Sequence, residues 1–385
     1  MVRIFITSNP ISTILMAAYA KRTKPEGSRD FLCIDHYFKK KALIELIHES
    51  AATHKWDTIL DFSFHIENNF DLKPSPREKI MRKVKHLPLI KNLYAGLLNR
   101  HLKKKAEHLA QKIKSKLAES GITIATNEEV EIYQLTQTEL NAGAEFLFPF
   151  AKVYYMEHGT VDYIYVIKKQ RKNGYICIFK DKYDDYLAKR NISFPVYQCL
   201  NKEEFTAGFL RAAPNLNIGL DKIKNASSKR LGIFLMDALE KFNPEPNFWT
   251  DYIDHSLKEI KNPKDYIILI KPHPSQSNEI MEITRAHFKK RNIDFIMLDK
   301  PEHSNLSVET IYVYYQKEID FVFSTFSAAI FYLAFFYGNQ SKFFYCYRFV
   351  GGYIKNAPLQ YKNSYEELED LINEVFSSQD CISLM

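Results

Sequence analysis

The sequence predicts an α/β protein in which two Rossmann-like domains face one another across a cleft. Short β-branched and aromatic runs alternate with stretches of helical periodicity in both halves of the chain. The alternation weakens between about residues 163 and 228 and then begins again, which indicates two separate sheets. A chain of 385 residues, 46% of them hydrophobic, can bury two cores.

The first half opens with a strand over residues 3–7, a loop at Ser8-Asn9-Pro10 and a helix over 11–20, because a β-branched run precedes turn residues and then helical spacing. The same signals predict its other elements, which are strands over 31–34, 58–62, 121–126 and 153–156 and a helix over 40–54. Between residues 163 and 228 only strands over 175–179 and 196–200 are predicted.

The second half has the pattern of another doubly wound domain. Strands are predicted over 231–236, 266–270, 294–298, 321–324 and 343–347, and helices over 248–260, 279–290, 308–316, 328–337 and 365–376. The predicted organisation is an N-terminal domain over 1–228, a C-terminal domain over 229–362, and a C-terminal helix in 363–385 that packs back on the N-terminal domain.

Cysteine usage and hydropathy indicate the compartment. The five cysteines are an odd number without a C-x-x-C pair, which argues against a disulfide framework and favours a reducing compartment. No stretch approaches the roughly 20 apolar residues that a membrane span needs, since the most apolar run covers only 328–337. We therefore expect a cytoplasmic protein that is soluble or peripheral on the membrane.

The net charge of +7 is concentrated in one region, Arg77 to Lys116, where basic residues meet only Glu78 and Glu107 as acids. Apolar residues recur there at helical spacing, which predicts amphipathic helices with a cationic outer face. The face is either an ordinary solvated surface or a landing area for an anionic acceptor or the anionic inner leaflet of the cytoplasmic membrane. Nucleic acid is disfavoured, because no aromatic residues are interleaved for base stacking.

The first motif that carries chemistry is Glu157-His158-Gly159, which follows the strand predicted over 153–156. A carboxylate beside an apolar strand suits a general base near neutral pH, and His158 is the second candidate. Gly159 is expected to allow a tight turn that projects both side chains. The plain alternatives are a loop carboxylate and a hydrogen-bonded core histidine.

The second motif is Lys271-Pro272-His273-Pro274, also at the end of a predicted strand. Two prolines restrict the backbone around His273 and fix where its imidazole points. The alternative is that the prolines only end the strand.

The third motif, Ser324-Thr325-Phe326-Ser327, closes a predicted strand and opens a predicted helix. Backbone N–H groups and hydroxyls at such a terminus can hold a phosphate, although the same residues can simply cap the helix. All three motifs fall at carboxyl ends of strands, where open α/β sheets bind their ligands.

No metal or cofactor is expected. The sequence has no His-Glu-x-x-His, zinc-type cysteine spacing, phosphate-binding Gly-x-x-x-x-Gly-Lys loop or Gly-x-Gly-x-x-Gly fingerprint. The one tight acidic cluster, Asp181 with Asp184 and Asp185, lies among lysines.

The three motifs together resemble those of the bacterial sialyltransferases with the GT-B fold, including the α-2,8-polysialyltransferases. That family carries an acidic D/E-D/E-G motif, an HP motif and a Ser-rich motif in this order, matched here by Glu157-His158-Gly159, His273-Pro274 and Ser324-Thr325-Phe326-Ser327. The resemblance implies an inverting, metal-independent transfer of sialic acid from CMP-sialic acid to a hydroxyl of a bacterial surface glycan, such as capsule or lipooligosaccharide.

The resemblance also implies roles for individual residues. Glu157 would deprotonate the acceptor and His273 would assist the departing phosphate. The nucleotide and phosphate would be held in the second domain by Lys271, Pro274, Glu309, Ser324, Thr325 and Ser327, with Glu309 on the ribose hydroxyls. Ser8, Asn9 and Gly159 would lie on the acceptor side, in the first domain.

One departure keeps alternatives open, because His158 stands where the family has a second acidic residue. His158-Gly159-Thr160 followed by His273-Pro274 also resembles the glycerophosphotransferases that polymerise wall teichoic acid from CDP-glycerol, in which His158 would be the base. Both families release CMP. A related nonulosonic acid or Kdo could replace sialic acid, and a non-catalytic glycan- or membrane-binding protein on a GT-B scaffold is the third hypothesis.

Overall fold

The structure is a computed structural model of the 385-residue chain. It describes all residues except 36–40, 63–87, 137, 139, 170–172, 214–215, 217, 219–228, 238–246, 274–275, 301–302, 304–305, 352, 354–367 and 377–381.

The described residues form two compact units. The N-terminal unit comprises Met1–His158, Tyr165–Lys180 and Ser193–Leu200, and the C-terminal unit comprises Gly159–Ile164, Asp181–Ile192 and Asn201–Met385. The chain therefore passes between the units several times. Helices α7 (Asp162–Lys169) and α8 (Lys180–Lys189) each span one of these passages.

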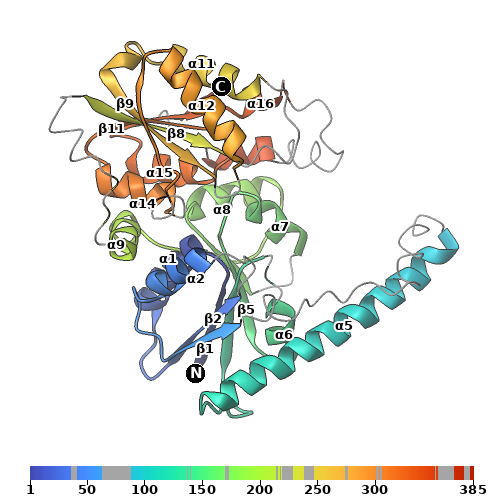
Figure 1. The fold of residues 1–385 in the computed structure, drawn as a ribbon. Helices are drawn as coiled ribbons and strands as arrows, with labels where there is room; N and C mark the ends of the chain where they lie inside the picture. The colour runs from blue at the N-terminus through green and yellow to red at the C-terminus, as the bar shows by residue number, and fades with distance from the viewer. Residues whose placement is uncertain are drawn as a thin grey trace. The chain divides into compact units, whose positions relative to one another are not determined.

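The N-terminal unit is built on a seven-stranded sheet in the order β3-β2-β1-β4-β5-β6-β7, in which each neighbouring pair is parallel. Its strands are β1 (Val2–Thr7), β2 (Arg29–Asp35), β3 (Thr58–Phe62), β4 (Val130–Gln134), β5 (Lys152–Met156), β6 (Gly174–Cys177) and β7 (Val196–Gln198). Its helices include α1 (Pro10–Thr23), α2 (Lys41–Ala51), α5 (Pro88–Glu119) and α6 (Leu140–Leu147). Figure 1 shows these helices on both faces of the sheet.

Alternate residues of β1 enter different cores, because successive side chains of a strand point to opposite faces. Ile4 and Ile6 belong to a core cluster with residues of α5 and α6. Phe5 points the other way, where its ring stacks on Tyr133 at 4.5 Å and meets Trp56 edge-on at 5.2 Å. Both faces are thus apolar, as expected for a parallel sheet covered by helices.

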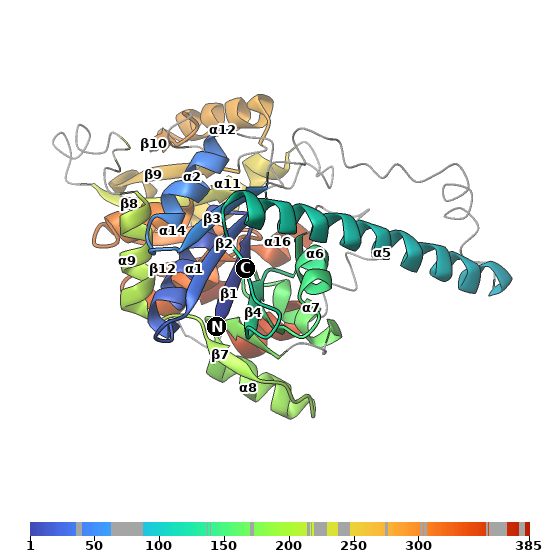
Figure 2. The same ribbon diagram turned by 90° about the horizontal axis from the view of Figure 1, so that it is seen from below.

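Helix α5 is 32 residues long, about 48 Å at the rise of an α-helix. Its C-terminal part packs on α6, and Gly143 of α6 makes this approach possible. A Cβ on Gly143 would lie 2.5 Å from the Cβ of Leu109, too close for two carbon atoms. The N-terminal part of α5 extends away from the rest of the unit (Figures 1 and 2).

The predicted amphipathic pattern is present in the described part of the basic region. Ile113 and Leu117 are buried, whereas Lys103, Lys104 and Lys114 are exposed. Residues 77–87 of this region lie outside the described residues.

The C-terminal unit contains a six-stranded parallel sheet in the order β10-β9-β8-β11-β12-β13. Its strands are β8 (Arg230–Met236), β9 (Tyr266–Pro272), β10 (Asp294–Met297), β11 (Ile319–Ser324), β12 (Lys342–Tyr345) and β13 (Ile382–Leu384). Its helices include α9 (Lys202–Ala212), α11 (Phe248–Lys258), α12 (Asn278–Lys290), α14 (Val308–Tyr315), α15 (Ala329–Tyr337) and α16 (Tyr347–Gly351), with a π-helix at Ile372–Phe376 and a 3-10 turn at Pro263–Asp265.

One face of this sheet packs on α11 and α12. The core there joins Phe234 and Ile270 of the strands to Trp249, Tyr252 and Phe288 of the helices, all at most 3% exposed. The 9 residues of α15 are almost all buried, which explains why the sequence shows an apolar run there instead of an amphipathic pattern.

Both sheets have the same topology. In each, the first strand lies between the second and the fourth, so the connections from β3 to β4 and from β10 to β11 cross the sheet, and the switch points lie between β1 and β4 and between β8 and β11. This is the Rossmann strand order, and ligands of such sheets bind beyond the carboxyl ends of the strands at that switch point. The predicted pair of Rossmann-like domains is confirmed.

The strand predicted over 121–126 is wrong. Gly121 has a φ of +69°, and the Ile122 N–H donates to the Leu117 carbonyl at 2.8 Å, so this segment ends α5. Ile122 and Ile124 are apolar because they pack against the core from a loop. The strand at this place in the fold is β4, which begins at Val130.

Helix α9, which the sequence assigns to the first domain, belongs to the C-terminal unit. Phe205 packs on Phe336 with ring centroids 4.7 Å apart, and the Thr206 hydroxyl hydrogen-bonds the Tyr337 hydroxyl at 2.6 Å. The division in the structure therefore differs from the predicted boundary near residue 228.

The segment 368–376 packs on parts of the chain from before residue 200 that belong to the same unit. Arg190 donates to Glu374 at 2.6 Å, and the Tyr163 and Phe376 rings meet edge-on at 5.1 Å. Among the described residues, no helix is both long and apolar enough to cross a membrane.

Candidate active site

Glu157 is the first residue after β5, at the carboxyl edge of the N-terminal sheet. Its side chain is fully buried. Its Oε2 accepts a hydrogen bond from the Ile178 N–H at 2.6 Å, and its own N–H donates to the Ile176 carbonyl at 3.0 Å. Because β5 and β6 are neighbours, these bonds join the ends of the two strands and hold the carboxylate at the edge.

His158 and Gly159 follow immediately, and both are partly exposed. The chain makes the expected tight turn at Gly159, whose carbonyl accepts from the Asp162 N–H at 3.1 Å, and the φ of Gly159 lies outside the left-handed region. A Cβ on Gly159 would meet no atom within 4 Å. The glycine therefore leaves open space beside His158.

Ser8 and Asn9 lie directly after β1, next to the switch point of the N-terminal sheet. The Asn9 side chain accepts from the Ser12 N–H at 2.9 Å and so forms the N-cap of α1. Ser8 is partly exposed at the same turn. Ser8, Asn9, Glu157 and His158 thus all lie at the carboxyl edge of one sheet, as predicted.

Two buried polar residues at this edge were missed by the sequence analysis. Asp35, the last residue of β2, accepts from the Leu140 N–H at 3.2 Å. Gln134, the last residue of β4, donates to Glu145 at 2.7 Å. The signal that would reveal both is a polar residue at the very end of an apolar run, the position that Glu157 also has.

In the C-terminal unit, His273 is the first residue after β9. Its N–H donates to the Met236 carbonyl at 2.8 Å, which extends the β8–β9 ladder by one bond, and its side chain is exposed. The imidazole is therefore placed at the carboxyl edge by a fixed backbone. Pro274 lies outside the described residues.

The Ser-rich motif forms the turn between β11 and α15, at the switch point of the same sheet. Ser324 and Thr325 are fully buried, whereas Ser327 is partly exposed. The turn is closed by the Ser327 N–H, which donates to the Ser324 hydroxyl at 3.0 Å. Asp237, which the sequence analysis did not single out, also bonds to this turn.

Lys271 and Glu309 are buried in the same unit, with 7% and 2% of each residue exposed. The Lys271 ammonium donates to the Pro272 carbonyl at 2.9 Å. Burial lowers the pKa of Lys271 to about 8, and the Glu309 charge opposes that shift. Burial raises the pKa of Glu309, against its hydrogen bonds with its own backbone and Ser307 and the charge of Lys271. Neither group presents its charge at the surface.

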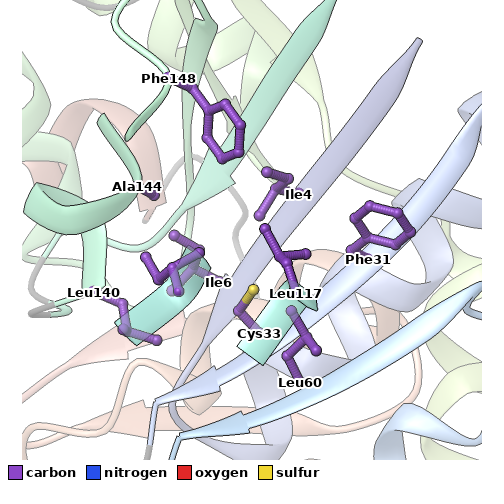
Figure 3. A pocket seen from close by; sticks show the side chains of 10 residues that line it. Ile4, Ile6, Phe31, Cys33, Leu60, Leu117, Leu140, Ala144 and Phe148 are labelled. Atoms are coloured by element: carbon purple, nitrogen blue, oxygen red, sulfur yellow. The ribbon is translucent and has the colours of Figure 1, made fainter. Parts of the chain in front are cut away.

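A small cavity in the N-terminal unit is not part of this site. It has a volume of about 10 Å³ and only apolar lining residues, among them Ile6, Cys33, Leu117, Leu140 and Phe148, which surround it from the sheet, α5 and α6 (Figure 3). A water molecule needs polar partners and at least this much room, so the cavity is a packing defect in the core.

Within the described ranges, no three His, Cys, Asp or Glu side chains are grouped as ligands for a metal ion. Glu157 and His158 lie at the carboxyl edge of the N-terminal sheet, and His273 and the Ser-rich turn lie at the carboxyl edge of the C-terminal sheet.

A family model described as alpha-2,8-polysialyltransferase (POLYST) matches residues 3–347. A search of curated proteins gives no match.

Solved structures are similar in fold. MnaA of Staphylococcus aureus, in a co-structure with UDP, superposes with a TM-score of 0.53 at 10% identity, covering 97% of this chain and 88% of that one. A UDP-N-acetylglucosamine 2-epimerase gives 0.52 at 11% identity, covering 99% and 92%. UDP-GlcNAc 2-epimerase of Neisseria meningitidis, bound to UDP-GlcNAc, gives 0.50 at 13% identity, covering 90% and 82%. At these identities the likeness shows the fold, which is of the GT-B type.

Proposed function

Because this chain belongs to the alpha-2,8-polysialyltransferase family and is a glycosyltransferase, we propose that it moves sialic acid, or a related nonulosonic acid, from a CMP ester to a hydroxyl of a bacterial surface glycan. The acceptor is a capsule or lipooligosaccharide chain, and the transfer inverts the anomeric configuration. The observation that carries the proposal is the family match across residues 3–347, which includes all three motifs at their strand ends.

In the proposed reaction, Glu157 accepts the proton of the acceptor hydroxyl as its oxygen attacks the anomeric carbon. The bond from that carbon to the phosphate oxygen breaks, and its electron pair leaves with CMP. Attack and departure take place on opposite faces, which gives inversion. His273 donates a hydrogen bond or a proton to the phosphate oxygen on which negative charge develops.

We propose that the phosphate and nucleotide are held in the C-terminal unit by the Ser324–Ser327 turn. Lys271 and Glu309, of which 7% and 2% are exposed, remain proposed contacts of the nucleotide, with Glu309 on the ribose hydroxyls. His273 and the hydroxyl of the partly exposed Ser327 supply the electrophilic assistance, and the proposed transfer is independent of metal ions.

The exposed charge of α5 supports a proposal about where the reaction takes place. Its exposed Lys103 and Lys104 face solvent. We propose that this helix draws an anionic glycan, or the anionic inner leaflet of the cytoplasmic membrane, to a protein that is peripheral there.

A second candidate is transfer of glycerol phosphate from CDP-glycerol. It is favoured by the exposure of His158, which is partly accessible, whereas Glu157 beside it is fully buried. A base must reach its proton directly or through one water, which the accessible imidazole does more easily. The membership of an enzyme family disfavours the third hypothesis, a non-catalytic scaffold.

A donor screen tests the proposal. The protein is incubated with CMP-Neu5Ac, CMP-Kdo or CDP-glycerol and an acceptor mixture, and released CMP is measured by mass spectrometry. We expect acceptor-dependent release from CMP-Neu5Ac. Release from CDP-glycerol alone overturns the sialyltransferase assignment, and release from CMP-Kdo alone changes the sugar but keeps the reaction class.

A further inference from the structure

Asp237 joins the ends of the two strands that flank the switch point of the C-terminal sheet. It is the first residue after β8, and among the described residues the donors to its Oδ2 atom lie at the end of β11 or in the turn that follows it. Oδ2 accepts from the N–H groups of Thr325 and Phe326 at 2.8 and 2.9 Å. It also accepts from the hydroxyls of Thr325 and Ser324 at 2.5 and 3.3 Å.

These bonds divide the three hydroxyls of the Ser-rich motif into two kinds. Ser324 and Thr325 give their hydroxyl protons to Asp237, and both side chains are fully buried. Ser327 is partly exposed. Its oxygen accepts a long bond of 3.4 Å from the Ala329 N–H, which uses a lone pair and leaves the hydroxyl proton for another acceptor.

The carboxylate also takes the two N–H groups that an anion at this turn would otherwise use. An ionised acceptor makes such bonds stronger than a neutral one does, so the turn is held firmly. The backbone N–H groups of Thr325 and Phe326 are therefore already hydrogen-bonded to Asp237. Ser327 is the member of the motif whose hydroxyl can still donate to a ligand.

We propose that Asp237 is a positioning residue for the donor: it fixes the turn through Ser324 and Thr325, so that Ser327 donates its hydroxyl to the phosphate of the donor. This inference rests on the proposed function, because it concerns the same phosphate. It assigns to Ser324 and Thr325 a supporting role in place of direct contact with the ligand.

The test compares five variants of the full chain for donor KM, acceptor KM, kcat, CMP affinity by calorimetry and Tm. Ser327→Ala is expected to raise donor KM and weaken CMP binding roughly 10- to 100-fold, the effect of losing one hydrogen bond to a charged group. Its Tm and acceptor KM are expected to stay at the wild-type values.

Asp237→Asn is expected to raise donor KM by a similar factor and to leave acceptor KM unchanged. Asp237→Glu is expected to raise donor KM by less than Asp237→Asn does. If Asp237→Asn fails to fold, Thr325→Val tests the same point, because it removes one hydroxyl bond to the carboxylate and keeps both backbone bonds. We expect Thr325→Val to raise donor KM less than Ser327→Ala does.

The matched control is Asp320→Asn. Asp320 lies near the opposite end of β11 and accepts from Arg230 at the start of β8, so it joins the same two strands at their amino ends. Its variant is expected to lower Tm without changing donor KM.

Equal donor KM for Asp237→Asn and Asp320→Asn overturns the positioning role. Two results together overturn the division of the motif: a wild-type donor KM in Ser327→Ala, and a donor KM raised 10-fold or more in Thr325→Val. A wild-type protein that binds no CMP and uses none of the CMP- and CDP-linked donors refutes the proposed function itself, which is a different result.

Discussion

Glu157 and Ile178 are joined across neighbouring strand ends by a hydrogen bond of 2.6 Å from the Ile178 N–H to the Glu157 carboxylate. A carboxylate held in this way cannot rotate freely, which is a useful property in a base that must meet an acceptor hydroxyl at a fixed place. The same bond makes the choice of substitution important, because alanine would remove the acceptor of a buried N–H.

Glu157→Gln keeps an oxygen for the Ile178 N–H but cannot take up a proton. We expect turnover to fall by about 10²- to 10⁴-fold, with CMP affinity and Tm unchanged. Steady-state kinetics and calorimetry check this. Near-normal turnover in Glu157→Gln, together with loss in His158→Ala, would make His158 the base and favour CDP-glycerol as donor.

His273→Ala removes an exposed imidazole while its backbone bond to Met236 remains. We expect kcat to fall strongly, because the charge that develops on the departing phosphate loses its partner. His108→Ala, which removes an exposed histidine of α5, serves as the control and is expected to be fully active. Full activity of His273→Ala would show that the Pro-His-Pro motif only ends the strand and has no role in the reaction.

Activity is expected to survive EDTA, since the proposed transfer places the Ser327 hydroxyl and His273 where a metal ion would otherwise neutralise the phosphate. CMP release is measured with and without chelator. Complete loss, with rescue by magnesium or manganese, would contradict the proposal and direct attention to Asp184 and Asp185.

Charge reversal of Lys103, Lys104 and Lys105 tests the role of α5. We expect a higher KM for long anionic acceptors and weaker binding to anionic liposomes, with unchanged kcat on a small neutral acceptor. Both effects should fade with added salt, because exposed charges are screened beyond roughly 8 to 10 Å at physiological ionic strength. The substitutions leave in place Leu109, Ile113 and Leu117, through which α5 shares a core with Leu140 and Ala144 of α6.

The control for this experiment is reversal of three exposed lysines of the other unit, Lys258, Lys261 and Lys264. An equal loss of liposome binding in both triple variants would show that only net charge matters. No change in either assay at low salt would leave the basic face as an ordinary solvated surface.

The buried pair Arg3 and Asp30 predicts how the N-terminal unit responds to acid. The Arg3 guanidinium donates to both Asp30 oxygens at 2.8 Å, and His54 contacts the same carboxylate at 2.9 Å. Burial acts to raise the pKa of Asp30, but the bonds with His54 and Arg3 outweigh it and hold the pKa at about 2, below the ordinary 3.8. The pair therefore stabilises the fold above pH 3.8 and loses this contribution as pH falls through 2.

Asp30→Asn is expected to lower the free energy of unfolding at pH 7 by about 3 to 5 kcal/mol, because it leaves Arg3 as a buried charge without its partner. Denaturant unfolding of wild type and variant should converge as the pH drops from 4 to 2. A difference between the two proteins that stays constant over this range would contradict the pKa assigned to Asp30.

The sequence predicts the strands of both sheets well, because buried parallel strands appear as short apolar runs between turn residues. It fails where an apolar run has another cause. Ile122 and Ile124 alternate like strand residues but pack from a loop, and no local pattern separates the two cases.

At the candidate site, the strand-end positions of Glu157 and His273 follow from the sequence because each motif ends its own apolar run. The partner of the Ser-rich turn does not follow, since Asp237 lies 88 positions before Thr325 and meets it only when β8 and β11 become neighbours. The burial of Glu309 cannot be predicted from the sequence either, because its position in the first turn of α14 is also typical of an exposed carboxylate.

The two tryptophans of the chain are divided between the two units, with Trp56 in one and Trp249 in the other. Trp56 is partly exposed beside His54, its ring centroid 4.5 Å from the imidazole, whereas Trp249 is 2% exposed in an aromatic core. Intrinsic fluorescence therefore carries two distinguishable signals, and a single Trp→Phe replacement in either unit leaves the other as its own optical probe. Whether one domain melts before the other can be observed directly, without any external label.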